Sequence, residues 1–253
     1  MIDAHAHLTD ERFSHDLDAV LQRAADAGLV RVLACGEDVA SSERAVALAA
    51  GSPRVRAAVG IHPHRASAAD ARALQRIREL AGEPCVVAVG EIGIDLSGRS
   101  APRPDQERAL LAQLELAADV DLPVCLHVRD SGPVVRALVD RVAGVRGYVH
   151  CYSEGADEVD QWIARGFLLS LAGTVTYPRS ERLRAAAALI PSERLLIETD
   201  APSLAPQARR GRRNEPAFVA FTYDEVARIR GVTPGRLAER VRENAASLFA
   251  GRW

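Results

Sequence analysis

The sequence predicts a (β/α)8 barrel with a functional site at the C-terminal ends of its strands. Its 253 residues match the usual length of this fold. Short apolar, β-branched runs alternate with helical patterns, which is typical of parallel βα units. Six of the seven histidines fall at or just beyond the end of such a run, where these barrels collect their catalytic groups. The strand pattern alone leaves an open, doubly wound sheet as the alternative.

Eight runs are expected to form the strands, and helical patterns separate them. The predicted strands cover residues 1–5, 30–34, 55–61, 85–89, 123–127, 147–150, 167–172 and 195–198. A loop rich in Pro, Gly and Arg follows the eighth strand over residues 203–216. Helices are expected after it, and Thr233 should cap the last one, with Pro234 at its first position. No linker or internal repeat is visible, so we expect one domain over residues 1–253.

The composition excludes several classes of function. The chain has 32 basic and 34 acidic residues and a net charge of -2, which argues against a protein that coats nucleic acid with a broad basic face. A local basic patch stays open. All 32 basic residues are arginine. The chain therefore has no lysine for a Schiff base, for a phosphate-binding loop or for a carboxylated bridge between two metals.

The remaining bulk features predict a cytoplasmic protein without a membrane partner, and we expect it to be a monomer. No run of 18 apolar residues is present, and the N-terminus has no basic segment followed by an apolar one. The four cysteines form no Cys-x-x-Cys pair, and three lie in or beside apolar runs. Buried, reduced thiols suit the cytosol better than disulfides do.

Side chains with metal-binding chemistry end five of the predicted strands. They are His5, His7, Glu91, His127, His150 and Asp200. Six such groups are too many for one catalytic zinc ion, which usually takes three protein ligands and a water. They suit two metal ions that share a carboxylate. Because no lysine is available, Glu91, which lies between two glycines, is the expected bridge. The alternative is that each polar group is satisfied by its own hydrogen bonds.

At these residues the chain resembles the TatD family of metal-dependent deoxyribonucleases, within the amidohydrolase superfamily. The motifs occur in family order over nearly the whole chain. They include Asp3-Ala4-His5-Ala6-His7-Leu8, Gly60-Ile61-His62-Pro63-His64, Gly90-Glu91-Ile92-Gly93-Ile94-Asp95, His127-Val128-Arg129-Asp130, His150-Cys151-Tyr152-Ser153, Glu198-Thr199-Asp200-Ala201-Pro202 and Arg213-Asn214-Glu215-Pro216. The resemblance implies a (β/α)8 barrel, two divalent metal ions and phosphodiester hydrolysis, often as a 3′–5′ exonuclease on single strands.

The resemblance also implies a role for each matched residue. One metal ion would be held by His5, His7, Glu91 and Asp200. The other would be held by Glu91, His127 and His150. Mg²⁺ or Mn²⁺ is expected in function, whereas a crystal can contain Zn²⁺ or Ni²⁺ from purification.

The catalytic residues are expected to be Asp200, Glu91 and His62. Asp200 would accept a proton from the attacking water and pass it to the leaving oxygen. Glu198, two residues before Asp200, is expected to support the metal ligands from behind or to be a polar core group.

The expected contacts to a single-stranded DNA substrate are His62, His64, Arg129 and Arg213. The two histidines can instead form a polar turn around Pro63. The arginines of the loop over residues 203–216 suit a phosphate backbone, with a solvated loop as the alternative.

Three features leave the substrate open. Arg129 can instead pair with Asp130 or Asp95. Where the family often has an aromatic residue after its Gly-Leu-Asp motif, this chain has Leu96. Candidate rings for base stacking near strand ends are few, namely Tyr152 and Tyr177.

Two other functions stay open. The same metal centre can hydrolyse a lactone, an amide or an aminoacyl-tRNA ester, and a barrel of this kind can be a non-catalytic binding protein. The complete set of metal ligands speaks against the second.

Overall fold

Eight strands lie in one sheet in the order of the sequence. The computed structural model describes residues 1–98 and 100–253, and within them the strand order is β1-β2-β3-β4-β5-β6-β7-β8. The strands are β1 (Ile2–Ala6), β2 (Arg31–Cys35), β3 (Val55–Val59), β4 (Val86–Asp95), β5 (Val124–Arg129), β6 (Gly147–Val149), β7 (Leu168–Leu171) and β8 (Leu195–Ile197). The pairs β3–β4, β4–β5, β5–β6 and β7–β8 are parallel. This order confirms the predicted (β/α)8 fold and excludes a doubly wound sheet, whose strand order reverses.

Helices follow the strands in alternation. They are α1 (Leu17–Asp26), α2 (Val39–Gly51), α3 (Ala71–Ala81), α4 (Arg103–Asp119), α5 (Gly132–Val139), α6 (Val159–Ile163), α7 (Glu181–Leu189), α8 (Val219–Arg230) and α9 (Pro234–Leu248). None of the helices that the structure describes is long and apolar enough to cross a membrane.

The chain forms two compact units. The first consists of residues 1–33 and 150–248, and the second of residues 34–149 and 249–253. The single domain over residues 1–253 stays a prediction.

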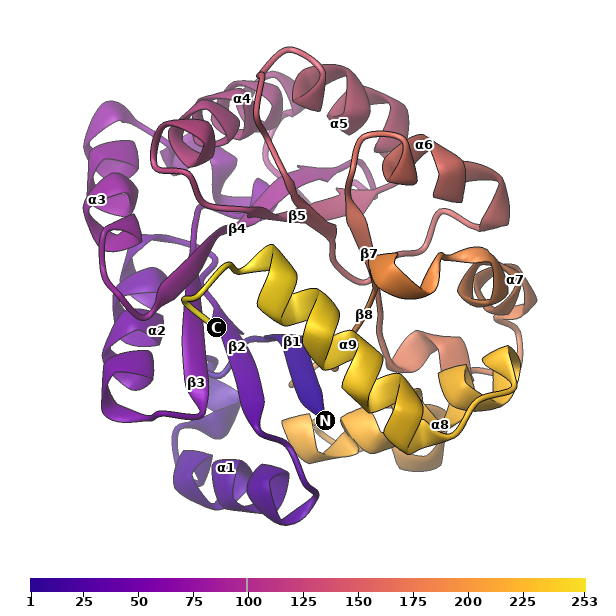
Figure 1. The fold of residues 1–253 in the computed structure, drawn as a ribbon. Helices are drawn as coiled ribbons and strands as arrows, with labels where there is room; N and C mark the ends of the chain where they lie inside the picture. The colour runs from indigo at the N-terminus through magenta and orange to yellow at the C-terminus, as the bar shows by residue number, and fades with distance from the viewer. Residues whose placement is uncertain (99) are drawn as a thin grey trace. The chain divides into compact units, whose positions relative to one another are not determined.

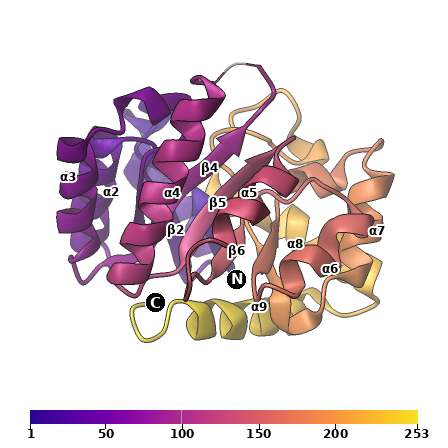
Figure 2. The same cartoon turned by 90° about the horizontal axis from the view of Figure 1, so that it is seen from above.

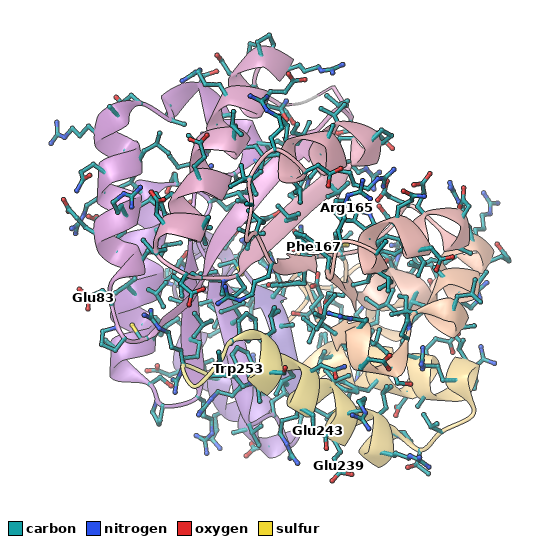
Figure 3. The ribbon with its side chains drawn as sticks, turned by 45° about the horizontal axis from the view of Figure 1, so that its top comes forward. Glu83, Arg165, Phe167, Glu239, Glu243 and Trp253 are labelled. Atoms are coloured by element: carbon teal, nitrogen blue, oxygen red, sulfur yellow. The ribbon has the colours of Figure 1, made fainter. Side chains whose placement is uncertain are left out.

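In the first unit, α8 and α9 lie side by side (Figure 1). α9 buries Leu237, Val241 and Ala245, whereas Glu239 and Glu243 project outward (Figure 3). Thr233 caps α9 as predicted, because its Oγ1 accepts a hydrogen bond from Arg236 N.

In the second unit, α4 packs along β4 and beside α5 (Figure 2). The strand β4 is longer than predicted and continues to Asp95, so Glu91 lies within it. Glycines at 90 and 93 obscured this extension, because glycine weakens a strand pattern. Gly93 pairs with His127 of β5 at φ 156, and a side chain there would overlap the His127 carbonyl oxygen.

Two candidate metal clusters

The first cluster lies at the end of β1 in the first unit. His5 and His7 are two residues apart on an extended backbone, so their imidazoles reach the same side, with their Nε2 atoms 3.2 Å apart. Asp200 Oδ1 is 3.4 Å from His7 Nε2 and 3.7 Å from His5 Nε2. The backbone fixes this arrangement, because Asp200 N donates to the His5 carbonyl and His7 N to that of Ala201. Three of the predicted ligands therefore meet here.

Two carboxyl groups near this cluster differ in their tendency to ionise. Burial disfavours the charged form of Asp200, but the hydrogen bond from His7 and the neighbouring imidazoles outweigh it and lower its pKa. Asp3 is fully buried and accepts hydrogen bonds from Thr199 N (2.9 Å) and Thr199 Oγ1 (2.6 Å). Burial nevertheless raises the pKa of Asp3 to about 7. Asp200 is thus the carboxylate that offers an anionic oxygen to the cluster.

His150 and Glu198 extend the first cluster. The His150 ring stacks on that of His5, with centroids 4.0 Å apart. Its Nδ1 is 3.1 Å from Glu198 Oε1, which also accepts a hydrogen bond from Cys151 N at 2.9 Å. Glu198 is fully buried, and its Oε2 has no hydrogen-bond partner among the described residues. Glu198 therefore contacts a predicted metal ligand and has a second carboxylate oxygen available to a cation.

The backbone after His150 is unusual. Cys151 has φ 44, in the left-handed region that residues other than glycine seldom adopt. Asp200 has φ 57. Such conformations persist where the surrounding structure enforces them, and they gather at functional sites.

The second cluster lies in the second unit and is centred on Glu91. Glu91 Oε1 is 2.7 Å from His127 Nδ1 and 3.2 Å from His62 Nε2. Glu91 and His62 are buried, with 1% and 4% of their surface exposed. Burial lowers the pKa of His62 although the Glu91 carboxylate acts in the opposite direction. The structure thus joins one predicted substrate contact, His62, to two predicted metal ligands.

Asp95 adds a second carboxylate to this cluster. Its Oδ2 lies 3.2 Å from both His127 Nε2 and His64 Nε2, and its Oδ1 accepts hydrogen bonds from Ser97. The contacts with His127 and Ser97 hold the pKa of Asp95 well below its usual range, against the effect of burial. The prediction considered Asp95 only as a partner of Arg129. Its position four residues after Glu91 was the available signal, because that spacing keeps both on one side of a strand.

Two buried glutamines on α4 hold the backbone beneath the second cluster. Gln113 Oε1 accepts a hydrogen bond from Ile61 N (2.7 Å), and its Nε2 donates to the Ile61 carbonyl (3.1 Å). Gln106 makes the same pair of bonds with Asp95. Sequence reasoning missed both glutamines, although a polar residue on the inner face of a predicted helix was a signal.

Both clusters have the chemistry that divalent metal ions require. The ligand atoms lie within 4.8 Å of one another in each of three groups, which are His5, His7 and Asp200; His5, His150 and Glu198; and His62, Glu91 and His127. Imidazole nitrogens and carboxylate oxygens are the usual ligands of Zn²⁺ and Mn²⁺. A cation would also satisfy the buried Oε2 of Glu198. The residues therefore fit a bound metal.

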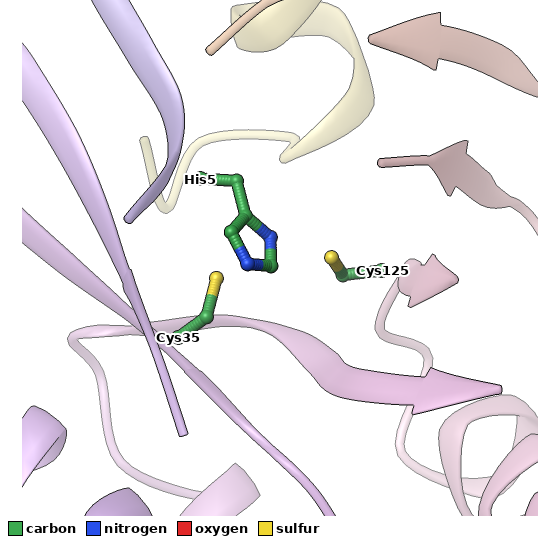
Figure 4. A group of neighbouring side chains, drawn as sticks. All are labelled: His5, Cys35 and Cys125. Carbon is green, nitrogen blue, oxygen red and sulfur yellow. The ribbon is translucent and has the colours of Figure 1, made fainter. Parts of the chain in front are cut away.

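Buried thiols lie in the second unit. Cys35 at the end of β2 and Cys125 on β5 are buried and form no disulfide, as predicted (Figure 4, drawn with His5). Cys151, in the first unit, also forms no disulfide and is only partly buried. No oxidised pair occurs among the described cysteines.

The residues that are predicted to contact the substrate differ in their exposure and in whether a carboxylate already pairs with them. Arg129 is more than half exposed, and its Nε is 3.9 Å from Asp130 Oδ2, so it is held only loosely. His64 is 44% exposed. Arg213 instead forms a bidentate ion pair with Asp16, with both N–O distances at 2.7 Å. Tyr152 is buried and donates its hydroxyl to the Gly155 carbonyl, which removes it as a stacking ring.

Comparisons with known proteins cover both units. Residues 2–250 match the model of a protein family described as TatD related DNase. The chain is 38% identical over 258 residues to the 3′–5′ ssDNA/RNA exonuclease TatD of Cronobacter sakazakii, covering 98% of this chain and 97% of that one. It is 34% identical over 251 residues to the uncharacterized metal-dependent hydrolase YabD of Bacillus subtilis, covering 98% of each. The crystal structure of YJJV, a TatD homolog from Escherichia coli, has a TM-score of 0.93 and 31% identity, covering 98% of this chain and 97% of that one.

Proposed function

The chain belongs to the family of TatD-related DNases, and on that premise we propose that it is a divalent-metal-dependent 3′–5′ exonuclease of single-stranded nucleic acid. The observation that carries the proposal is the pair of buried histidine–carboxylate clusters, since both consist of side chains that ligate catalytic metal ions. Relatives that match nearly the whole chain are named as exonucleases of ssDNA and RNA, which supports the bond and the substrate.

Six residues are proposed as metal ligands. His5, His7, His150 and Asp200 belong to the first cluster, and Glu91 and His127 to the second. We propose that they hold two divalent ions, Mg²⁺ or Mn²⁺ in function, and the bridging role of Glu91 stays a prediction. When bound, such ions polarise a phosphodiester and lower the pKa of water.

Side chains of the protein are proposed to transfer the proton and to bind the substrate. The Asp200 carboxylate, ionised near neutral pH, is proposed to accept a proton from the water that attacks phosphorus and to pass it to the leaving 3′ oxygen as the P–O bond breaks. His62, held beside Glu91, is proposed to orient a phosphate oxygen, as are His64 and Arg129 from more exposed positions. A cytoplasmic location and a monomeric state belong to the same proposal.

Hydrolysis of labelled single strands tests the function. Metal-free protein is incubated with 20-residue DNA and RNA strands that carry a label at the 5′ end, with and without Mn²⁺ or Mg²⁺. We expect a ladder shortened progressively from the 3′ end that needs metal and falls at least about 100-fold in Asp200→Asn. Arg228→Ala, on the surface of α8, should match the unchanged protein.

Two outcomes would overturn the proposal. One is a metal-loaded protein that releases no nucleotides but opens lactones or hydrolyses amides or aminoacyl-tRNA esters. The other is nucleotide release that survives in Asp200→Asn, which points to a contaminating nuclease.

A further inference from the structure

The loop that follows Asp200 returns to the strand end from which it starts. Asn214 Nδ2 donates to the carbonyls of Thr199 (2.9 Å) and Ser203 (2.7 Å), and Asn214 N donates to that of Pro202. Whatever this loop carries is therefore held at the same strand end as Asp200, all within the first unit.

One arginine of the loop serves to anchor it. Arg213 pairs with Asp16, and its guanidinium lies over the Phe13 ring at 4.7 Å. The hydrogen bond from Arg213 lowers the pKa of Asp16 to about 2. Next to it, Arg23 donates to Glu215 at 2.6 Å. The charge of Arg213 is thus already balanced by a carboxylate.

Three other arginines of the loop have no such partner. Arg209, Arg210 and Arg212 form no ion pair with a carboxylate in residues 1–98 and 100–253. Surface arginines elsewhere in this unit do form such pairs, for example Arg228 with Glu225 at 2.8 Å. The loop therefore presents positive charge that the chain does not neutralise, although the net charge of the protein is -2.

Aromatic rings hold two of these guanidinium groups in place. The Arg209 guanidinium lies 5.3 Å from the Phe218 ring centre and 5.1 Å from that of Phe221. That of Arg210 lies 4.3 Å above the Tyr177 ring. A guanidinium stacked on a ring keeps its N–H groups at the edge, where they can donate to an anion.

Hydrogen bonds hold the segment that carries Tyr177 against the loop after β8. The Tyr177 hydroxyl donates to the Ala205 carbonyl (2.9 Å), and Gln207 N donates to Thr176 Oγ1 (2.8 Å). These bonds join the segment after β7 to the loop after β8. Arg210 and Arg212 are exposed on the surface that this segment and the loop form, and Tyr177 is partly exposed. A ligand would find the surface already formed, which reduces the entropy lost on binding.

We propose that Arg209, Arg210, Arg212 and Tyr177 form a docking surface for the sugar-phosphate backbone of a single strand, beside the strand end that carries Asp200. Guanidinium groups bind phosphate oxygens in pairs, and the Tyr177 ring or the stacked Arg210 offers a plane to a base. The proposal rests on the proposed function for the identity of the strand as substrate. Arg213 is not part of this surface, because Asp16 already balances its charge, and its predicted contact with the substrate stays a prediction.

Strand binding without catalysis tests the docking surface. The full chain is titrated in EDTA against a fluorescent 20-residue oligothymidylate, with fluorescence anisotropy read between 50 and 200 mM NaCl. Replacing all three arginines by Ala should weaken binding at least about 10-fold at low salt. It should also flatten the slope of log K against log salt by about 2, because each phosphate contact on a single strand contributes about 0.7. Arg228→Ala is the matched control and should bind like the unchanged protein.

Three results would overturn the proposal. They are a triple variant that is folded by circular dichroism yet binds like the unchanged protein, an equal loss in Arg228→Ala, and arginine-dependent binding to polyglutamate or to phosphatidylserine vesicles without binding to the strand. The two proposals can fail separately. Arginine-dependent strand binding without nucleotide release rejects the exonuclease and keeps the docking surface. Nucleotide release together with unchanged strand binding in the triple variant rejects the docking surface and keeps the exonuclease.

Discussion

At the scale of single residues, Glu198 contacts His150, a proposed metal ligand of the first cluster. Its Oε1 accepts hydrogen bonds from both His150 Nδ1 and Cys151 N. With its Nδ1 held by Glu198, His150 would bind a metal ion through Nε2, which is how carboxylates commonly orient histidine ligands. We therefore propose that Glu198 is a positioning residue.

Substitution of Glu198 distinguishes positioning from direct ligation. Glu198→Ala should weaken Mn²⁺ binding about 10- to 100-fold in calorimetry of the metal-free protein. Glu198→Gln should keep most of the affinity, because an amide oxygen can accept both hydrogen bonds. An equal loss in the two variants would show that the carboxylate itself binds the metal. Unchanged binding in Glu198→Ala would reject any role.

The sequence predicted which residues carry metal-binding chemistry better than it predicted their partners. His5 and His7 could be placed together because two positions on a strand share a side. The pairing of Arg213 with Asp16 joins residues 197 positions apart, and no local pattern encodes it. The sequence therefore could not show which arginine of the loop was already neutralised.

At the scale of elements, β4 depends on Gly93. A Cβ there would overlap the His127 carbonyl oxygen, and the φ of 156 is unfavourable for any other residue. Gly93→Ala should lower the free energy of unfolding by about 2–5 kcal/mol, measured by urea denaturation. Gly51→Ala is the control, because a Cβ at the end of α2 meets no atom within 4 Å. A stability loss in Gly93→Ala no larger than that of Gly51→Ala would contradict this account of the strand.

The packing of α8 on β1 depends on the hydroxyl of Tyr223. This buried group donates to the Ile2 carbonyl (3.1 Å) and accepts a hydrogen bond from Ile2 N (3.3 Å). Tyr223→Phe removes both bonds in a buried place and should cost about 1–3 kcal/mol of stability. Tyr177→Phe, which loses one bond at a partly exposed site, should cost less. Equal urea midpoints for the two variants would contradict the prediction.

The predicted strand boundaries were wrong where glycine residues interrupt the apolar pattern. Apolar, β-branched composition located every strand, but Gly90 and Gly93 hid the second half of β4. That half carries Glu91 and Asp95, so the same extension accounts for the missed carboxylate of the second cluster.

At the scale of the whole molecule, alternation of strand and helix predicted parallel βα units, because parallel strands need a helical connection, and eight strands in a chain of this length favoured the (β/α)8 order over a doubly wound sheet. The absence of lysine then limited the chemistry. It left carboxylates and imidazoles as metal ligands and arginine as the main cationic contact for phosphate. Both expectations agree with the clusters and with the unpaired arginines of the loop after β8.

The number of metal ions per chain tests the central claim most directly. The protein is stripped with EDTA, dialysed and titrated with Mn²⁺ in a calorimeter, with elemental analysis of the loaded sample. The account predicts two Mn²⁺ ions per chain, held by six imidazole and carboxylate side chains. A single tightly bound ion, or none, would contradict it.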